Sequence, residues 1–182
     1  MRRPQAAGGT GDVSCRPATS AFTRTSKRRR GFPSEAQVKK GDRIVHGDAV
    51  AHNVTVELDL WPGVLPVKAD NVQLQQVILN LMLNAFSAMS GTGQDGPRRV
   101  IVRTSSTDAS NVLIEVQDSG TGIAAEKLES IFDPFVTSKP EGLGMGLSIC
   151  RSIVERHHGR ITVANNPDRG AKFSIRLPAT HE

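Results

Sequence analysis

The sequence predicts a two-layer α/β (α+β) sandwich in which helices pack on one face of a mixed sheet of about five strands. Two segments repeat apolar residues at the three- and four-residue spacing of a helix, and shorter segments alternate apolar and polar residues as half-buried strands do. The order is strand, helix, strand, strand, helix, strand, strand. This order indicates one layer of helices over one sheet.

The amino-terminal part of the chain differs from the rest in charge. Residues 1–40 carry a net charge of +8, whereas residues 41–182 carry −3. Residues 1–35 contain almost no large apolar residue and are expected to be disordered, and residues 35–50 predict at most a weak helix. We place a basic tail or lead-in at 1–45 and one domain at 46–180. The basic run at 27–30 is typical of a solvated tail, so we expect no specific nucleic-acid partner.

Cysteine usage and hydropathy exclude several other classes. The two cysteines, Cys15 and Cys150, form no CxxC pair, which argues against disulfides and a structural metal. No stretch reaches the roughly 18 to 20 apolar residues of a membrane span, and no secretory signal is present. The sequence therefore predicts a cytoplasmic location.

The predicted elements begin with a strand over residues 54–60, where apolar residues alternate. A core-facing helix over 70–89 follows, with Asp70 or Asn71 available as N-cap. Strands at 100–104 and 112–117 form a hairpin around a turn at 107–111. The apolar positions of the helix over 70–89 are Leu74, Val77, Ile78, Leu81, Ala85 and Met89.

The second half of the domain begins with a glycine-rich, irregular segment that runs to Gly146. One short helix is predicted within it, over 124–131. A second long helix follows and stops at Gly159, and strands at 160–164 and 171–177 end the fold.

A polar stripe lies beside the apolar face of the first helix, because Gln76, Asn80 and Asn84 recur at every fourth residue. An ordinary solvated stripe is the alternative, but such stripes usually contain Lys and Glu, which this helix lacks. An uncharged carbonyl oxygen suits Mg²⁺ when phosphates supply the other ligands. The stripe is therefore a candidate metal and phosphate site.

A carboxylate enters a tight glycine turn at the end of the strand 112–117, in the segment from Asp118 to Ile123. The carboxylate of Asp118 could accept a hydrogen bond from an exocyclic amine, while Gly120 and Gly122 would let the backbone approach a flat ring. A turn without any ligand is the alternative, since most turns of this composition are only turns.

Three glycines at alternate positions, Gly142, Gly144 and Gly146, precede the second long helix. Backbone N–H groups in such a turn, together with a helix N-terminus, form an anion site fit for phosphates. The segment matches neither a Walker A loop nor a Rossmann turn. Lys139, just upstream, could add a positive charge against the terminal phosphates.

Taken in order, these segments resemble the GHKL superfamily, specifically the ATP-binding catalytic domain of sensor histidine kinases of the nitrogen-regulation and oxygen-sensing subgroup. The resemblance covers about residues 54–178. Residues 75–89 resemble the N box, with Asn84 at the Mg²⁺-coordinating position, and 118–122 resemble the G1 box, whose Asp binds the adenine amino group. Residues 132–135 resemble the F box, 142–147 the G2 box and 170–173 the last strand.

The resemblance implies a protein-histidine kinase domain with a GHKL-type fold, which binds Mg-ATP under a mobile lid over 120–142. It would transfer the γ-phosphate to a histidine on a separate dimerisation and phosphoacceptor segment that this chain lacks. A nucleotide-binding regulatory module is the alternative. The implied catalytic residues are Asn80, Asn84 and Lys139, and the implied ATP-binding residues are Asn80, Asn84, Asp118, Gly120, Gly122, Ile123, Phe132, Thr137, Ser138, Lys139, Gly142, Leu143, Gly144, Met145, Gly146 and Leu147.

The implied partners are the phosphoacceptor domain and, indirectly, a response regulator; a membrane would be reached only through missing segments of a parent kinase. Asn80 stands where ATP-hydrolysing relatives place a Glu, which favours transfer over hydrolysis. Ala171 and Lys172 stand where many relatives offer a hydroxyl near the adenine. No histidine lies in an acceptor motif, so we expect solvated or packed roles for His46, His52, His157, His158 and His181.

Overall fold

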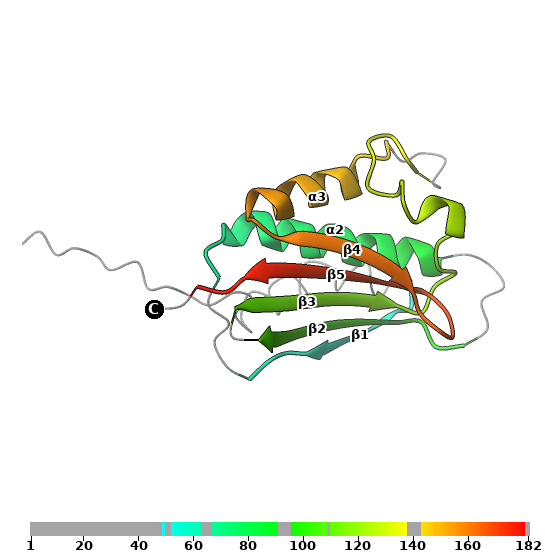
Figure 1. Ribbon diagram of the computed structural model, residues 1–182. Coiled ribbons are helices and arrows are strands. Elements are labelled where there is room, and N and C mark those ends of the chain that lie inside the picture. Colours follow the sequence, from blue (N-terminus) through cyan, green and yellow to red (C-terminus); the bar gives the residue numbers. More distant parts are fainter. Residues whose placement is uncertain are drawn as a thin grey trace, which may run out of the picture.

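The computed structural model describes residues 49, 52–62, 67–90, 96–108, 110–137 and 143–180. Within these residues two helices lie above a single sheet (Figure 1). The elements are β1 (Thr55–Asp59), α2 (Asn71–Met89), β2 (Arg99–Asp108), β3 (Asn111–Asp118), the 3₁₀ turn η1 (Ala125–Lys127), α3 (Gly146–Arg156), β4 (Arg160–Asn165) and β5 (Ala171–Pro178).

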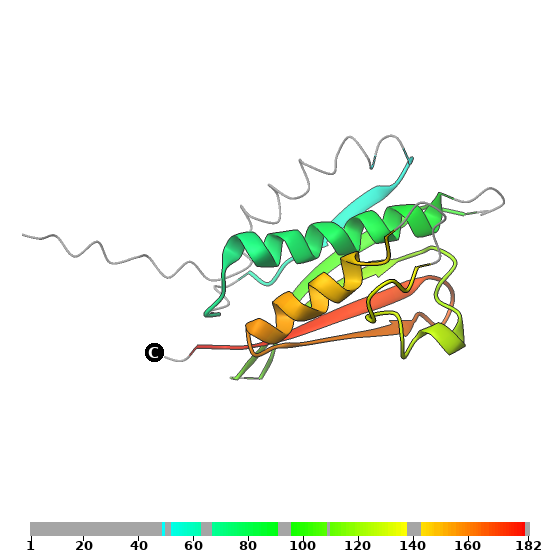
Figure 2. The same ribbon diagram turned by 90° about the horizontal axis from the view of Figure 1, so that it is seen from above.

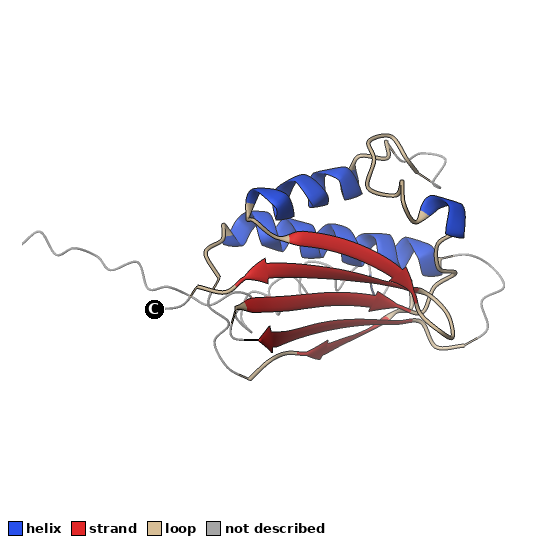
Figure 3. Ribbon diagram, in the orientation of Figure 1, coloured by secondary structure: helices blue, strands red, loops and turns tan. Residues whose placement is uncertain are grey.

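The sheet has the strand order β1-β2-β3-β5-β4. β1 pairs with β2 in parallel, and the other three pairs are antiparallel, so the sheet is mixed. α2 and α3 cover the same face of the sheet (Figure 3) and lie side by side across the strands (Figure 2). The predicted two-layer architecture with five strands is confirmed.

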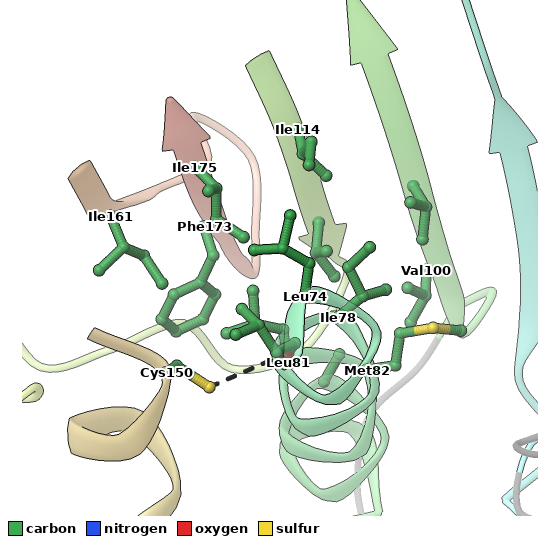
Figure 4. Close-up of a cluster of buried hydrophobic side chains, with 14 of the residues drawn as sticks. Leu74, Ile78, Leu81, Met82, Val100, Ile114, Cys150, Ile161, Phe173 and Ile175 are labelled. Carbon is green, nitrogen blue, oxygen red and sulfur yellow. Dashed lines mark hydrogen bonds between the residues drawn. The ribbon is translucent and has the colours of Figure 1, made fainter. Parts of the chain in front are cut away.

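α2 begins where the sequence offers a capping side chain. Asp70 is the N-cap, and its carboxylate accepts hydrogen bonds from the backbone of Val72 at 2.8 Å and of Gln73 at 3.2 Å. The helix then buries one apolar face against the sheet (Figure 4). This face consists of Leu74, Val77, Ile78, Leu81, Met82, Ala85, Phe86 and Met89.

The core lies between this face, α3 and the inward side chains of the strands. β3 and β5 alternate strictly between buried and less buried residues, as strands with one covered face do. Figure 4 shows Ile114, Phe173 and Ile175 reaching from the sheet toward Leu74 of α2, while Cys150 points from α3 toward the same helix.

Two expectations about the second half need correction. The helix predicted over 124–131 is only the single turn η1, because Ala124 supplies no side-chain cap and turns follow from Leu128. α3 ends at Arg156, before Gly159. His158 takes the left-handed turn with φ of 58°, and Gly159 is needed because a Cβ there would lie 2.6 Å from the Arg176 carbonyl oxygen.

The β2–β3 hairpin is longer than predicted. β2 continues to Asp108 and β3 begins at Asn111, so most of the expected turn at 107–111 belongs to the ladder. The register of the pairing shifts between Ser106 and Asp108, so the ladder contains a β-bulge at this point.

Candidate functional site

Asp118 is one of two buried polar side chains among the described residues, and it lies at the end of β3. Its Oδ1 accepts hydrogen bonds from the backbone N–H groups of Gly120 at 2.8 Å and Ala171 at 3.2 Å. Burial raises the pKa of Asp118, and the two backbone donors partly oppose this shift. Both bonds end on the same oxygen, and the carboxylate is 5% exposed.

The turn after Asp118 fits closely against the rest of the domain at its glycines. A Cβ on Gly120 would lie 2.9 Å from the carbonyl oxygen of Ala88 in α2. Gly122 has a φ of 74°, which favours glycine. Gly170, with a φ of 85°, approaches the Asp118 carbonyl so closely that a Cβ would lie 2.0 Å from its oxygen. Because these positions are glycines, the turn after Asp118, the end of α2 and the connection between β4 and β5 pack closely around one carboxylate.

The polar stripe of Gln76, Asn80 and Asn84 runs along α2 between this turn and α3. Asn80 and Asn84 are half-buried and Gln76 is exposed. The Asn80 amide nitrogen lies 3.8 Å from the sulfur of Cys150, which is the fifth residue of α3. Ala88, two helical turns further along α2, packs against the glycine turn, since a Cβ on Gly120 would lie 2.9 Å from its carbonyl oxygen. Asn84 lies one helical turn from Asn80 and from Ala88, on the same side of α2.

The thiol of Cys150 connects the two helices a second time, because it donates to the Val77 carbonyl oxygen at 3.9 Å. Burial raises the pKa of Cys150 to about 11, which keeps the thiol protonated and able to donate. The contact between Cys150 and Asn80 joins residues 70 positions apart, so no local pattern in the sequence indicated it.

The segments on either side of residues 138–142 meet. Phe135 donates its backbone N–H to the Gly144 carbonyl at 3.1 Å, and Gly144 has a φ of 65° with its Cα packed on the Phe135 backbone. Gly146 opens α3, and a Cβ there would meet nothing within 4 Å. Among the described residues, the space beside the first residue of α3 is therefore open. The first N–H groups of a helix have no partner within the helix and favour an anion.

The other predicted ligand-binding residues divide into anchors and exposed groups. Phe132 is buried and packs edge-on against Phe173, with ring centroids 6.2 Å apart. Ile123 and Leu147 are half-buried against the core, whereas Thr137, Leu143 and Met145 are exposed. Ser138, Lys139 and Gly142 lie outside the described residues.

Two site residues were missed by the sequence analysis, Asn165 and Asn166. The Asn165 side chain bonds both backbone groups of Ile123, and the Asn166 side chain donates to the Asp118 carbonyl at 2.9 Å. The only signal for them in the sequence was two adjacent asparagines shortly before Gly170.

The histidines in the described residues that make contacts are packed, as expected. His157 Nε2 accepts from the Asp70 backbone N–H at 2.9 Å and its Nδ1 lies 2.7 Å from the Ile153 carbonyl oxygen. His52 Nδ1 lies 2.8 Å from the Ser90 hydroxyl. His46 and His181 lie outside the described part of the chain.

Among the residues that the structure describes, no helix combines the length and apolar content that crossing a bilayer requires. Nor does any group of three or more His, Cys, Asp and Glu side chains gather there as a metal cluster.

A helix-backed mixed sheet with a buried carboxylate and glycine turns beside an amide stripe defines an ATP-binding domain of the GHKL type. Residues 69–181 match the family model described as "Histidine kinase-, DNA gyrase B-, and HSP90-like ATPase", and the chain belongs to this family. It has the ATP-binding domain of sensor histidine kinases, and the resemblance drawn from the sequence is confirmed.

Individual relatives agree with this assignment. The sensor protein TdiS of Thauera aromatica is 40% identical over 131 residues, which cover 72% of this chain and 24% of the relative. The sensor histidine kinase ZraS of Escherichia coli K12 is 40% identical over 136 residues, or 75% of this chain and 28% of ZraS. The chain thus spans about a quarter of the curated relatives it matches.

Solved structures show the same fold. The catalytic domain of histidine kinase ThkA superposes with a TM-score of 0.66 at 29% identity, covering 80% of this chain and 94% of that domain. ThkA solved in complex with the response regulator protein TrrA superposes with a TM-score of 0.63 at 29% identity, covering 80% of this chain and 40% of ThkA.

Proposed function

We propose that this domain binds Mg-ATP and transfers the γ-phosphate to a histidine on a separate dimerisation and phosphoacceptor segment. The observation that carries this proposal is the buried Asp118 carboxylate, held beside the asparagine stripe of α2. Membership of the family and the similarity to the ThkA catalytic domain support it. A regulatory module that binds nucleotide without transfer is the second candidate.

Asp118 is suited to select adenine. Its Oδ1 is already engaged by two backbone donors, so the second carboxylate oxygen is the proposed acceptor for the exocyclic amine. A charged acceptor in a dry site makes a stronger hydrogen bond than a neutral one. The glycines of the turn bring its backbone close to this carboxylate and to the β4–β5 hairpin. A Cβ on Gly120 would lie 2.9 Å from Asp118 Oδ1, and one on Gly122 would lie 3.0 Å from Asn165 Oδ1.

The amide stripe fits a magnesium ion bound together with phosphates. α2 carries no charged side chain between Asn71 and Met89, so its polar face offers neutral oxygen ligands. Asn84 is the proposed protein ligand, with Asn80 beside it. When bound, Mg²⁺ would neutralise charge on the phosphate oxygens. The open α3 N-terminus at Gly146, and the side chain of Lys139, are the proposed contacts for the remaining phosphate charge.

Two observations favour transfer over hydrolysis. Asn80 has no carboxylate with which to activate water, and its amide nitrogen is turned toward Cys150. Exposed apolar side chains at and before the start of α3 could also be buried by an incoming acceptor helix. They are Phe135, Leu143, Met145 and Ile149.

Two of the described histidines, His157 and His158, lie too far from the proposed phosphate site for self-phosphorylation. His157 and His158 follow the C-terminal end of α3, an 11-residue helix, and Gly146 opens its other end. At 1.5 Å per residue this separation is about 16 Å, too far for in-line attack on a phosphate at the α3 N-terminus. We therefore propose that the acceptor histidine comes from a different segment or chain.

Radiolabelled ATP tests the proposal directly. The chain alone should bind ATP but gain no acid-labile label, and adding a phosphoacceptor hairpin of a related kinase should produce slow labelling of that hairpin. Asn84→Ala should bind and transfer poorly and serves as the matched control. Nucleotide binding without label on any cognate hairpin would favour the regulatory module, and no nucleotide binding would reject both candidates.

The remaining assignments extend this proposal to the whole protein. We propose that residues 46–180 form the catalytic domain behind a separate lead-in at 1–45. A response regulator would receive the phosphoryl group indirectly, in line with the ThkA complex with TrrA. Limited proteolysis followed by mass determination would test the boundary, because a folded domain resists cleavage beyond its first ordered residues.

A further inference from the structure

The side chain of Asn165, the last residue of β4, pairs with the main chain of Ile123. Oδ1 accepts from the Ile123 N–H at 2.8 Å, and Nδ2 donates to the Ile123 carbonyl at 2.7 Å. This exchange of two bonds is the pattern that one residue makes with its partner in an antiparallel ladder. Asn165 thus gives an irregular segment the partner that a neighbouring strand would otherwise provide.

The same hairpin end also holds Asp118. The Asn166 side chain donates to the Asp118 carbonyl at 2.9 Å, and its backbone N–H donates to the Gly170 carbonyl at 2.9 Å. Ala171 donates to the Asp118 carboxylate. Both ends of the turn from Asp118 to Ile123 are therefore fastened to the β4–β5 hairpin, one end through Asn166 and the other through Asn165.

The residues between these two fastenings include Gly120 and Gly122, whose backbones have wide conformational freedom. A Cβ on Gly122 would lie 3.0 Å from the Asn165 Oδ1, so the amide also closes the space beside that glycine. Without Asn165, the carboxyl-terminal half of the turn would keep no side-chain tie to the hairpin among the contacts described here.

We propose that Asn165 is a positioning residue that sets the preference of the nucleotide site for adenine over guanine, an inference that rests on the proposed function. Guanine carries a carbonyl oxygen where adenine carries its amine, so a guanine base would bring this oxygen against the Asp118 carboxylate. A fixed turn enforces that mismatch, because the polar groups cannot move to relieve it. A loosened turn lets the base shift, and selectivity falls.

A purely structural role would give a different result. Asn165 is exposed, so its removal leaves no cavity and the fold should persist. General destabilisation would weaken every ligand alike. Loss of positioning would instead weaken adenine nucleotides, change guanine nucleotides little, and leave the phosphate contacts intact.

The test compares Asn165→Ala with Asn165→Asp and with the control Thr162→Ala, an exposed residue of the same strand. Calorimetry with Mg-ADP, Mg-GDP and Mg-tripolyphosphate measures selectivity and phosphate binding separately. Loss of two net hydrogen bonds in Asn165→Ala should lower the ADP-to-GDP affinity ratio about tenfold, with tripolyphosphate affinity unchanged. Asn165→Asp, which retains the acceptor for the Ile123 N–H, should lose less, and Thr162→Ala nothing.

Amide hydrogen exchange gives a readout that needs no nucleotide. The Ile123 N–H should exchange about tenfold faster in Asn165→Ala than in the wild type. Faster exchange together with a lower affinity ratio supports the proposal. If the wild type prefers ADP to GDP and Asn165→Ala has the same affinity ratio, the proposal is wrong and the proposed function stands. A wild type that binds no nucleotide rejects the proposed function itself, and this inference with it.

Discussion

Asn80 and Cys150 are joined by a hydrogen bond of 3.8 Å from the side-chain amide nitrogen to the thiol sulfur, across the contact of α2 with α3. The thiol is fully buried and donates its S–H to the Val77 carbonyl oxygen. One side chain therefore packs the two helices and orients an amide of the proposed phosphate site. Because the nitrogen faces the sulfur, the Asn80 oxygen is directed away from it.

The first prediction concerns Cys150→Val at high pH. The pKa of the folded thiol is about 11 against an ordinary 9.0, so between these values the unfolded state loses a proton that the folded state keeps. Wild-type stability should therefore fall as the pH rises through this window, by about 2 kcal/mol at pH 10.5. Urea unfolding at pH 8 and pH 10.5 measures it. Parallel losses in wild type and variant would show that the thiol is not the cause.

The second prediction is that Asp118→Asn stabilises the nucleotide-free domain while weakening nucleotide binding. Burial raises the pKa of Asp118, so its stabilising contribution is present in acid and is lost as the pH rises through the folded value. At pH 7 the charged carboxylate is a cost that Asn removes. Melting temperature should rise at pH 7 and converge with wild type in acid.

ATP affinity of the same variant should fall by about one to two decades, since the amine loses a charged acceptor. Calorimetry that finds unchanged affinity would reject Asp118 as the adenine anchor.

The third prediction separates the two faces of α2. Leu81 is fully buried, so Leu81→Ala should open a cavity and cost roughly 2 to 5 kcal/mol of stability. Asn84 is half-buried on the polar stripe, and Asn84→Ala should abolish Mg²⁺-dependent binding with a smaller stability loss. Thermal melts decide between them. A larger loss for Asn84→Ala would mean that the stripe is structural.

The fourth prediction compares two glycines. An added Cβ at Gly170 would lie 2.0 Å from the Asp118 carbonyl oxygen, and the backbone there has a positive φ, so Gly170→Ala should fail to fold or melt far below wild type. An added Cβ at Gly146 would meet no described atom within 4 Å, so Gly146→Ala should fold normally and be stabilised by about 0.4 to 1 kcal/mol. Circular dichroism melts check both, and equal effects would contradict the assigned roles.

The long elements were predictable because their signals are local. The apolar spacing of α2 and the capping carboxylate of Asp70 lie within one helix, and the alternation of β5 lies within one strand. The prediction of a helix over 124–131 was wrong, because composition alone does not supply a cap or a packing face.

The sequence indicated candidate site residues only where a residue type carries its own chemistry. Asp118 in a glycine turn indicates a hydrogen-bond acceptor, whereas Asn165 acts through a contact with a residue 42 positions away. Cys150 likewise meets Asn80 only after α3 packs on α2. Contacts made across the fold leave no pattern along the chain, which is why the supporting residues were missed.

The pairing of β3 with β5 joins two hairpins, β2–β3 and β4–β5, each closed by a short connection. Short loops close quickly and long ones slowly, so each hairpin should form before the seam between them. Asp118 and Ala171 face each other across this seam. The proposed adenine anchor therefore forms only when the two hairpins dock. Bound nucleotide should slow the separation of the hairpins, which would be measured as slower hydrogen exchange at Ala171.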